Sequence, residues 1–305
     1  MNSPAGKPHI LAAAALGLIL VAGLVNLLSL PDRSEAESPA RETITEKTEA
    51  EQKAAKQVDK LKATQKTQQR KADEAQERLD TAVSALEEDG YTVSYIICDL
   101  NSANTLEYNA DAIHYSASTI KAPFVISVME GDSGDYMRAA YGPQVEATLV
   151  NSDNEAYSTL RKAYYSQPYW SDFCARAQVD PENAHWYKHL SVREMARLWT
   201  TAHPWLSSGS ENAQWICDLL SDSYKSLIDD LAGPAARSTW SKAGWYAGDP
   251  EFNVTFNAGI VNADFGSYVI SVAISKGGDF EALQSIMEPL FDTWNASHQL
   301  PAAAA

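Results

Sequence analysis

Apolar and polar positions divide the first third of the chain into two contrasting stretches. Residues 10–30 are almost wholly apolar, which is about the length that a helix needs to cross a bilayer. Lys7 precedes this run and acidic residues follow it, a charge bias that favours a cytoplasmic N-terminus. We therefore predict a cytoplasmic tail over residues 1–8 and an uncleaved transmembrane signal anchor over residues 9–30. A cleaved signal peptide is the alternative, although its apolar core is usually shorter.

A long polar segment follows, and we predict a charged helical stalk over residues 31–89. Residues 41–89 contain no Gly and no Pro and are rich in Glu, Lys, Gln and Ala, so helix propensity is high throughout. Alternating steps of four and three residues form a thin heptad seam, which comprises Ala54, Val58, Leu61, Gln65, Gln68, Ala72, Ala75, Leu79, Ala82 and Leu86. Self-association as a coiled coil and a single solvated helix both fit this pattern.

The pattern changes again after Gly90, and residues 90–298 are predicted to form one α+β domain. Alternating and β-branched runs indicate early strands at 91–100 and 105–108 and late strands at 253–261 and 268–274. Helical periodicity lies between them and after them, at 144–149, 155–165, 191–202, 213–220 and 280–294. Ser191 and Glu194 form a capping box at the start of one of these helices. We expect an antiparallel sheet flanked by helices, an additional all-helical lobe, and an unstructured tail at 299–305.

Composition narrows the classes of partner. The net charge of −16 and the pI of about 4.7, with no basic patch, exclude a typical nucleic-acid-binding protein. Cys98, Cys174 and Cys217 are far apart and form no Cys/His cluster, so we expect neither a metal site nor a cofactor. If the domain lies outside the cytosol, one pair of cysteines could form a disulfide, and the sequence does not choose the pair.

Candidate chemistry begins with a serine three residues ahead of a lysine. If Ser118 opens a helix, Lys121 lies one turn later on the same face, and its amine can reach the serine hydroxyl. A hydroxyl needs such a base to become a nucleophile, and burial can lower the pKa of a lysine toward neutrality. Alone the motif is a weak signal, because serine is an ordinary N-cap and lysine an ordinary surface residue.

Two further motifs follow downstream in a characteristic order. They are Ser152-Asp153-Asn154 and Lys242-Ala243-Gly244-Trp245. Together with the Ser-x-x-Lys motif, this series resembles the active-site motifs of class A β-lactamases and penicillin-binding proteins. The resemblance covers roughly residues 91–297 and implies an αβα sandwich with an active site in the groove between the sheet region and the helical lobe.

The resemblance also implies catalytic roles for four side chains. Ser118 would attack a carbonyl carbon, and Lys121 would take its proton as general base. Ser152 would relay a proton to the leaving nitrogen, with its hydroxyl tied to Lys242. Lys242 would also attract the substrate carboxylate. A solvated charge on an edge strand is the alternative interpretation of Lys242.

Binding roles are implied for neighbours of these residues. Asn154 would offer its amide to the side-chain amide of the substrate, whereas Asp153 shapes the loop. Gly244 would let a strand come close to the substrate. The backbone N–H of Trp245 would join that of Ser118 in holding the developing oxyanion. A polar turn or a helix cap is the alternative reading of the Ser152-Asp153-Asn154 motif.

The chain departs from the family at several positions. Class A enzymes carry a Glu-Pro-x-x-x-Asn loop whose glutamate activates the deacylating water, and the matching interval here, residues 173–191, lacks it. Glu182 is the only glutamate available, and its surroundings favour a turn; His185 and His189 are alternative bases. Ala243 stands where the family usually has a hydroxyl residue, and Trp245 is bulky where it often has a small one. Arg237 is either a replacement carboxylate partner or a surface arginine.

The sequence therefore predicts a membrane-anchored, extracytoplasmic serine hydrolase of a bacterial cell surface, acylated at Ser118. Its partners would be a small-molecule β-lactam or a peptidoglycan peptide, and the membrane. A non-hydrolytic relative that binds wall peptides as a sensor or scaffold is the alternative. A coiled-coil adhesin with an incidental serine motif would explain the stalk but leaves the three motifs unexplained.

Overall fold

The computed structural model describes residues 39–299 except residues 103 and 185. The predicted tail at 1–8, the predicted anchor at 9–30 and residues 300–305 lie outside this part. None of the helices that the structure describes is long and apolar enough to cross a membrane. The described residues divide into two units, which are Ala75–Trp294 and the remainder at 39–74 and 295–299.

The first helix, α1 (Pro39–Glu88), extends through 50 residues, as the absence of Gly and Pro predicts. In residues 39–74, Val58 and Leu61 of the proposed seam are about half exposed. Arg70 and Glu74 form an i,i+4 ion pair of 2.7 Å on the helix surface. The role of this part as a stalk, and its self-association, stay predictions.

The last turns of α1 belong to the compact domain, so the predicted boundary at residue 90 is wrong. Ala75, Leu79, Val83 and Leu86 are buried in the domain core. Three of these four residues are the positions that the seam assigned to a coiled coil. An apolar stripe on a helix can pack on a partner helix or on a sheet, and here it belongs to the core that the sheet forms with the C-terminal helix. Gly90 then ends the helix with a φ of +87°, a left-handed conformation that glycine adopts without strain.

One five-stranded antiparallel sheet forms the centre of this unit. The strands lie in the order β2-β1-β7-β6-β5, so the chain's first strand pairs with its last along its whole length. Their bounds are β1 Val93–Asp99, β2 Thr105–Tyr108, β5 Ala236–Tyr246, β6 Val254–Ala263 and β7 Gly266–Ile274. The predicted antiparallel sheet and its early and late strands are confirmed.

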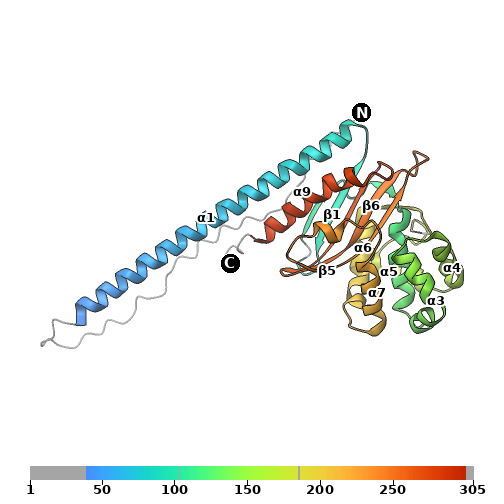
Figure 1. The fold of residues 1–305 in the computed structure, drawn as a ribbon, viewed down its shortest axis with the longest axis horizontal. Helices are drawn as coiled ribbons and strands as arrows, with labels where there is room; N and C mark the ends of the chain where they lie inside the picture. The colour runs from blue at the N-terminus through green and yellow to red at the C-terminus, as the bar shows by residue number, and fades with distance from the viewer. Residues whose placement is uncertain (1–38, 103, 185, 300–305) are drawn as a thin grey trace. The chain divides into compact units, whose positions relative to one another are not determined.

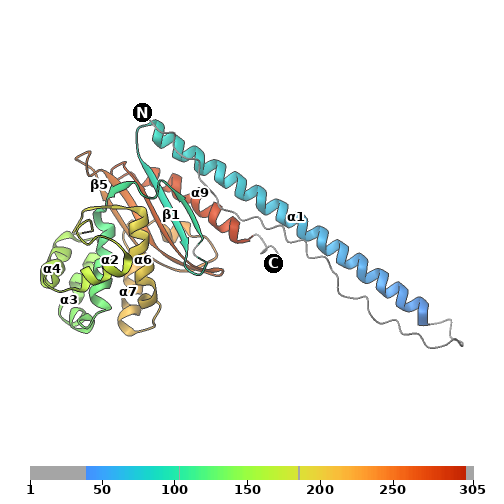
Figure 2. The same cartoon turned by 180° about the vertical axis from the view of Figure 1, so that it is seen from behind.

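Helices cover both faces of the sheet. The final helix α9 (Phe280–Gln299) lies on one face with the end of α1 (Figure 1), and the short helix α8 (Ile228–Leu231) adds to that core. The helical lobe lies on the other face (Figure 2). Its helices are α2 Lys121–Met129, α3 Gly134–Leu149, α4 Asn154–Tyr164, α5 Tyr169–Ala177, α6 Val192–Leu206 and α7 Glu211–Ser221. The predicted all-helical lobe is present.

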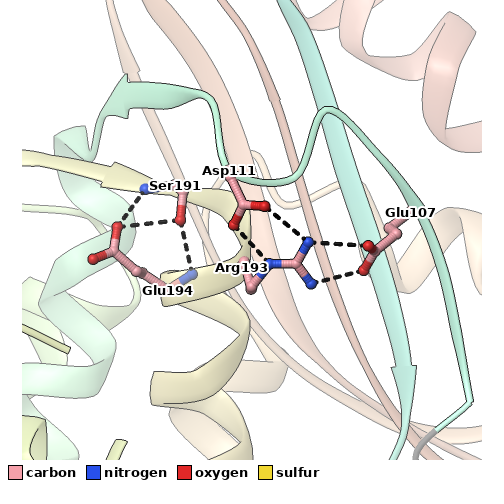
Figure 3. A network of polar contacts seen from close by, with 5 residues as sticks. All are labelled: Glu107, Asp111, Ser191, Arg193 and Glu194. Carbon is pink, nitrogen blue, oxygen red and sulfur yellow. Dashed lines mark hydrogen bonds and ion pairs between the residues drawn. The ribbon is translucent and has the colours of Figure 1, made fainter. Parts of the chain in front are cut away.

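A two-stranded ladder, which the sequence did not predict, joins the sheet region to the lobe. Strands β3 (Ile113–Tyr115) and β4 (His189–Ser191) pair antiparallel, and three residues are too few to show an alternation. Ser191 then begins α6 with the predicted capping box, which is confirmed. Figure 3 shows that Arg193 beside it binds Glu107 of β2 and Asp111 of the following loop.

The three cysteines are free thiols, and Cys174 and Cys217 are buried. Burial raises the pKa of the Cys174 and Cys217 thiols to about 12. Their chemistry is therefore that of small apolar core residues.

Candidate active site

The serine of the first motif lies in a tight helical turn. The 3₁₀ turn η1 (Ala117–Ile120) runs directly into α2, and Ala117 before the serine takes a left-handed conformation with a φ of +43°. Such a backbone is strained for a residue with a Cβ and needs the surroundings to hold it. Ser118 is half-buried at the second position of the turn. Its N–H is thus among those that a helix start leaves without an intrahelical acceptor.

The edge strand β5 packs directly against this turn at Gly244. A Cβ at this position would lie 2.6 Å from the backbone nitrogens of Ser118 and Thr119 and 3.1 Å from the carbonyl oxygen of Ser116. Only glycine permits this approach. Sequence reasoning assigned the glycine to close approach of the substrate. The structure shows its close approach to the turn Ala117–Ile120, named the nucleophile turn after the predicted role of Ser118.

Lys121 is fully buried beneath the turn. Its Nζ donates to the carbonyl oxygen of Ser152 at 2.5 Å and to Oδ1 of Asn154 at 2.8 Å, and it lies 3.5 Å from the Ser152 hydroxyl. Burial lowers the pKa of Lys121 to about 8, against the opposing effect of Asp153. No hydrogen bond from this amine to the Ser118 hydroxyl is present among the described residues. Lys121 therefore joins the first motif to the second.

The second motif forms a sharp turn into α4. Ser152 is left-handed with a φ of +60°, and the Asp153 carboxylate accepts a hydrogen bond of 2.6 Å from the N–H of Ala156 as the N-cap. The expectation that Asp153 shapes the loop agrees with this contact. Asn154 is exposed at the start of the helix, so its amide is accessible.

Lys242 of the third motif is also fully buried, which excludes the solvated edge charge considered for it. Burial, and then the charge of Lys121, lower the pKa of Lys242 to about 7. Its Nζ lies 3.3 Å from the carbonyl oxygen of Ala243, and no hydrogen bond to Ser152 is present among the described residues. Two buried ammonium groups that repel each other rarely carry both protons at neutral pH.

Trp245 directs its side chain away from the reactive serine. Side chains alternate along a strand, so Trp245 and Gly244 face opposite sides of β5. The indole ring contacts the rings of Phe280 and Tyr224, with centroids 5.4 and 6.1 Å away. The bulky ring of Trp245 therefore packs on the face of β5 opposite to the one on which Gly244 meets the turn of Ser118.

The remaining candidates lie elsewhere or contribute differently. Arg237 is 72% exposed and pairs with Asp264 at 2.6 Å, which favours the surface interpretation. Ala243 is fully buried and brings no hydroxyl to the site. The ring of His189 lies 5.7 Å from that of Tyr115. Together with Tyr246 and Phe252 these two rings form an aromatic cluster around Tyr115, three residues before Ser118.

Glu182 lies on the surface beside Lys188 and has no contact with the candidate active-site residues among the described contacts. Its carboxylate is 79% exposed and lies 3.8 Å from the amine of Lys188, and its backbone is held by Asp180. It lines a cavity of about 260 Å³ in the helical lobe with Arg161 and Trp170. His185, the other alternative, is outside the described residues.

Two tyrosines at the site were not among the sequence candidates. Nζ of Lys121 lies 5.6 Å from the ring centroid of Tyr157 and 5.7 Å from that of Tyr187. The hydroxyl of Tyr187 donates to Oδ1 of Asn154 at 3.1 Å. Tyr187 lies within the interval in which the family carries its glutamate, and that position is the only signal that could have identified it.

Comparisons with known proteins agree with this arrangement. Residues 74–138, which contain the nucleophile turn, match the model of the β-lactamase enzyme family. A β-lactamase from Chitinophaga pinensis superposes with a TM-score of 0.58 at 15% identity, covering 73% of this chain and 99% of that one. A β-lactamase from Sphaerobacter thermophilus gives 0.56 at 18% identity over 73% and 97%. A search of curated proteins by sequence found no match.

The penicillin-binding protein PBP-A has the same fold. It superposes with a TM-score of 0.53 at 16% identity over 72% of this chain and 96% of that one. A variant of it has been solved as an acyl-enzyme complex with penicillin G. The comparisons confirm the predicted resemblance to the β-lactamase and penicillin-recognising superfamily. At these identities the structural matches establish the fold.

Proposed function

We propose that this chain is a serine hydrolase acylated at Ser118 by a β-lactam or by a peptidoglycan peptide amide. The observation that supports this most is the meeting of all three motifs at one turn. Lys121 donates to the backbone of Ser152 and to the side chain of Asn154, and Gly244 lies against the backbone of Ser118. Lys242 completes the set, since its charge is close enough to that of Lys121 to lower its own pKa. A chance match of three short motifs does not require such convergence.

Acylation uses the buried lysine as a base. Neutral Lys121 removes the proton of the Ser118 hydroxyl as the oxygen bonds to the substrate carbonyl carbon. The N–H groups of Ser118 and Trp245 hold the resulting oxyanion. A pKa of about 8 leaves a usable fraction of Lys121 neutral near pH 7, which an ordinary exposed lysine lacks.

The amide bond then breaks and the leaving nitrogen needs a proton. Ser152 provides the path, because its hydroxyl lies 3.5 Å from the Lys121 amine that holds the proton. Lys242 supplies positive charge for the substrate carboxylate, a role that the missing hydroxyl at Ala243 leaves to it. Asn154 presents its amide from the exposed start of α4.

None of the described side chains that contact Lys121 is a carboxylate in position to activate water for deacylation. Asp153 caps α4 with its side chain, and Glu182 lies beside Lys188. A long-lived acyl-enzyme follows, as in a penicillin-binding protein, and the natural acceptor of the acyl group is then water or an amine of a wall peptide.

We also propose, from the sequence, where in the cell the protein lies. The apolar residues 9–30 support a single-pass anchor with the catalytic domain outside the cytoplasm, and the polar helix supports a stalk that associates with a second copy. Carbonate extraction of membranes tests the anchor, and release of the protein by carbonate would count against it. Cross-linking of the full chain tests association of the stalk, and recovery of the monomer alone would count against that.

The central test is intact-protein mass measured over time after exposure to penicillin G. We expect an adduct of one penicilloyl group that persists, is absent in Ser118→Ala and is retained in Ser116→Ala. Ser116 is a matched control, because it lies in the same turn and its hydroxyl has no partner among the described residues. No adduct on the wild-type chain would overturn the proposal and favour the non-hydrolytic wall-peptide binder.

A further inference from the structure

The position of Tyr187 is fixed by the backbone around the nucleophile turn. Strands β3 and β4 pair Tyr115 with His189, and the N–H of Ser116 donates to the carbonyl oxygen of Lys188 at 2.9 Å. The ladder therefore runs up to the residue after Tyr187 on one strand and to the nucleophile turn on the other. Tyr187 is in this way attached to the backbone that carries Ser118.

The residue before it is held in a bend. Trp186 has a φ of +59°, which is unfavourable for a bulky residue and needs tertiary support. The hydroxyl of Tyr157 lies 3.4 Å from the Trp186 carbonyl oxygen, and the two rings are 6.2 Å apart. The bend turns the next side chain toward Lys121 and Asn154.

The two tyrosine rings enclose the amine of Lys121. Their centroids lie 5.2 Å from each other and 5.6 and 5.7 Å from Nζ, while the segment 152–154 covers the amine with its oxygens. Lys121 is left with no exposed surface. Tyr157 is part of the fully buried core, so Tyr187, which is only half-buried, is the removable part of this enclosure.

The phenol of Tyr187 cannot act as the missing base. Burial raises its pKa well above the ordinary value, so it remains protonated at neutral pH. It donates its proton to Asn154 and presents an apolar ring to the lysine. The interval that carries a water-activating carboxylate in the family thus presents a neutral, water-excluding group here.

We propose that Tyr187 is a positioning residue whose ring seals Lys121 from water and so prolongs the life of the Ser118 acyl-enzyme. This inference rests on the proposed function. Hydrolysis of that ester consumes one water. Its oxygen bonds to the acyl carbon, the bond from that carbon to Oγ of Ser118 breaks, one proton passes through a base to Oγ, and the acid leaves with the other proton. Lys121 is the base at hand, and the seal prevents water from reaching it.

The charged and titratable groups around Lys121 determine how its pKa responds to loss of the Tyr187 ring. They are Lys242 from β5, Asp153 before α4, Tyr157 from α4 and Tyr187 itself. Removing the ring leaves the first three in place and admits water. Hydration favours the charged amine, so the pKa of Lys121 moves up toward its ordinary value.

The test compares Tyr187→Ala with Tyr187→Phe in the full chain. Tyr187→Phe retains the ring and loses only the hydrogen bond to Asn154. Acylation by penicillin G is followed by mass across pH, and the lifetime of the adduct is measured above both pH midpoints, where Lys121 is neutral in every variant. For Tyr187→Ala we expect the midpoint of acylation to rise by about one pH unit and the lifetime to fall about tenfold, because the seal is lost.

Tyr187→Phe should keep the midpoint and the lifetime of the wild type, because the ring is what excludes water. Unchanged values in a folded Tyr187→Ala would overturn the inference, and so would equal changes in both variants. If Tyr187→Ala does not fold, as judged by circular dichroism, Tyr187→Ser and Tyr187→Leu repeat the comparison between a small polar and a large apolar side chain. Failure of the wild type to form any adduct would instead refute the proposed function.

Discussion

Gly244→Ala adds one methyl group at the contact between β5 and the nucleophile turn. The new Cβ would lie 2.6 Å from two backbone nitrogens, those of Ser118 and Thr119. Neither can rotate away as a side chain would. The strand and the turn must therefore separate by about 0.8 Å to restore an ordinary contact of 3.4 Å.

This displacement should reduce the acylation rate strongly and the free energy of unfolding only moderately. In the proposed mechanism the turn carries both the attacking oxygen and one oxyanion donor, and the strand carries the other donor. A misplacement of about 1 Å at such a site can lower a rate about 100-fold. Overpacking usually reduces the free energy of unfolding by about 1–3 kcal/mol, less than the total stability of most domains, so the variant should remain folded.

The assay is the rate of acylation by a fluorescent penicillin, with urea unfolding measured in parallel. Gly142→Ala is the matched control, because a Cβ there would meet nothing within 4 Å. We expect wild-type labelling and equal or greater stability for the control. Gly244→Ala labelled at the wild-type rate would refute the reasoning, since the two oxyanion donors would then tolerate the separation.

Three further predictions concern stability, and urea unfolding measures each. The pKa of Lys121 is about 8 in the folded state against an ordinary 10.5, so the unfolded state binds more protons between these values. The free energy of unfolding of the wild type, relative to that of Lys121→Met, should therefore rise by roughly 2–4 kcal/mol from pH 8 to pH 10.5. No rise would mean that Lys121 is not desolvated. Leu79→Ala should lower the free energy of unfolding by about 2–5 kcal/mol, and substitution of the exposed Leu61 by Ala should leave it nearly unchanged. Equal effects would show that the end of α1 is not part of the core. Arg193→Met should lower the free energy of unfolding by only about 1–2 kcal/mol, because Arg193 and Glu107 are about one-third exposed and Asp111 is 77% exposed; no loss would show that the network of Figure 3 does not stabilise the fold.

Local sequence signals were sufficient for most elements. The gap in Gly and Pro over residues 41–89 predicted a long helix, and the capping box at Ser191 placed the start of α6. The alternating runs gave β1, β2, β6 and β7 within a few residues. These signals succeed because each depends on neighbours along the chain.

Other features depended on contacts that no local pattern encodes. The stripe at Ala75, Leu79 and Leu86 is apolar whichever surface covers it, and only the fold shows that the sheet does. Strands β3 and β4 are too short for periodicity, yet their pairing places Tyr187 next to Asn154 in the candidate active site.

The sequence alone determined the residue types of the candidate site and their order, because the three short motifs lie in local stretches of the chain, and a serine nucleophile needs a base beside it. The tertiary structure decided the environment of those groups: it buried both lysines and so lowered their pKa values, and it turned the indole of Trp245 to the opposite face of its strand from Gly244. It also placed Tyr187 against Lys121. Desolvation and ring contacts arise between segments distant in the chain, so only the folded protein could specify them.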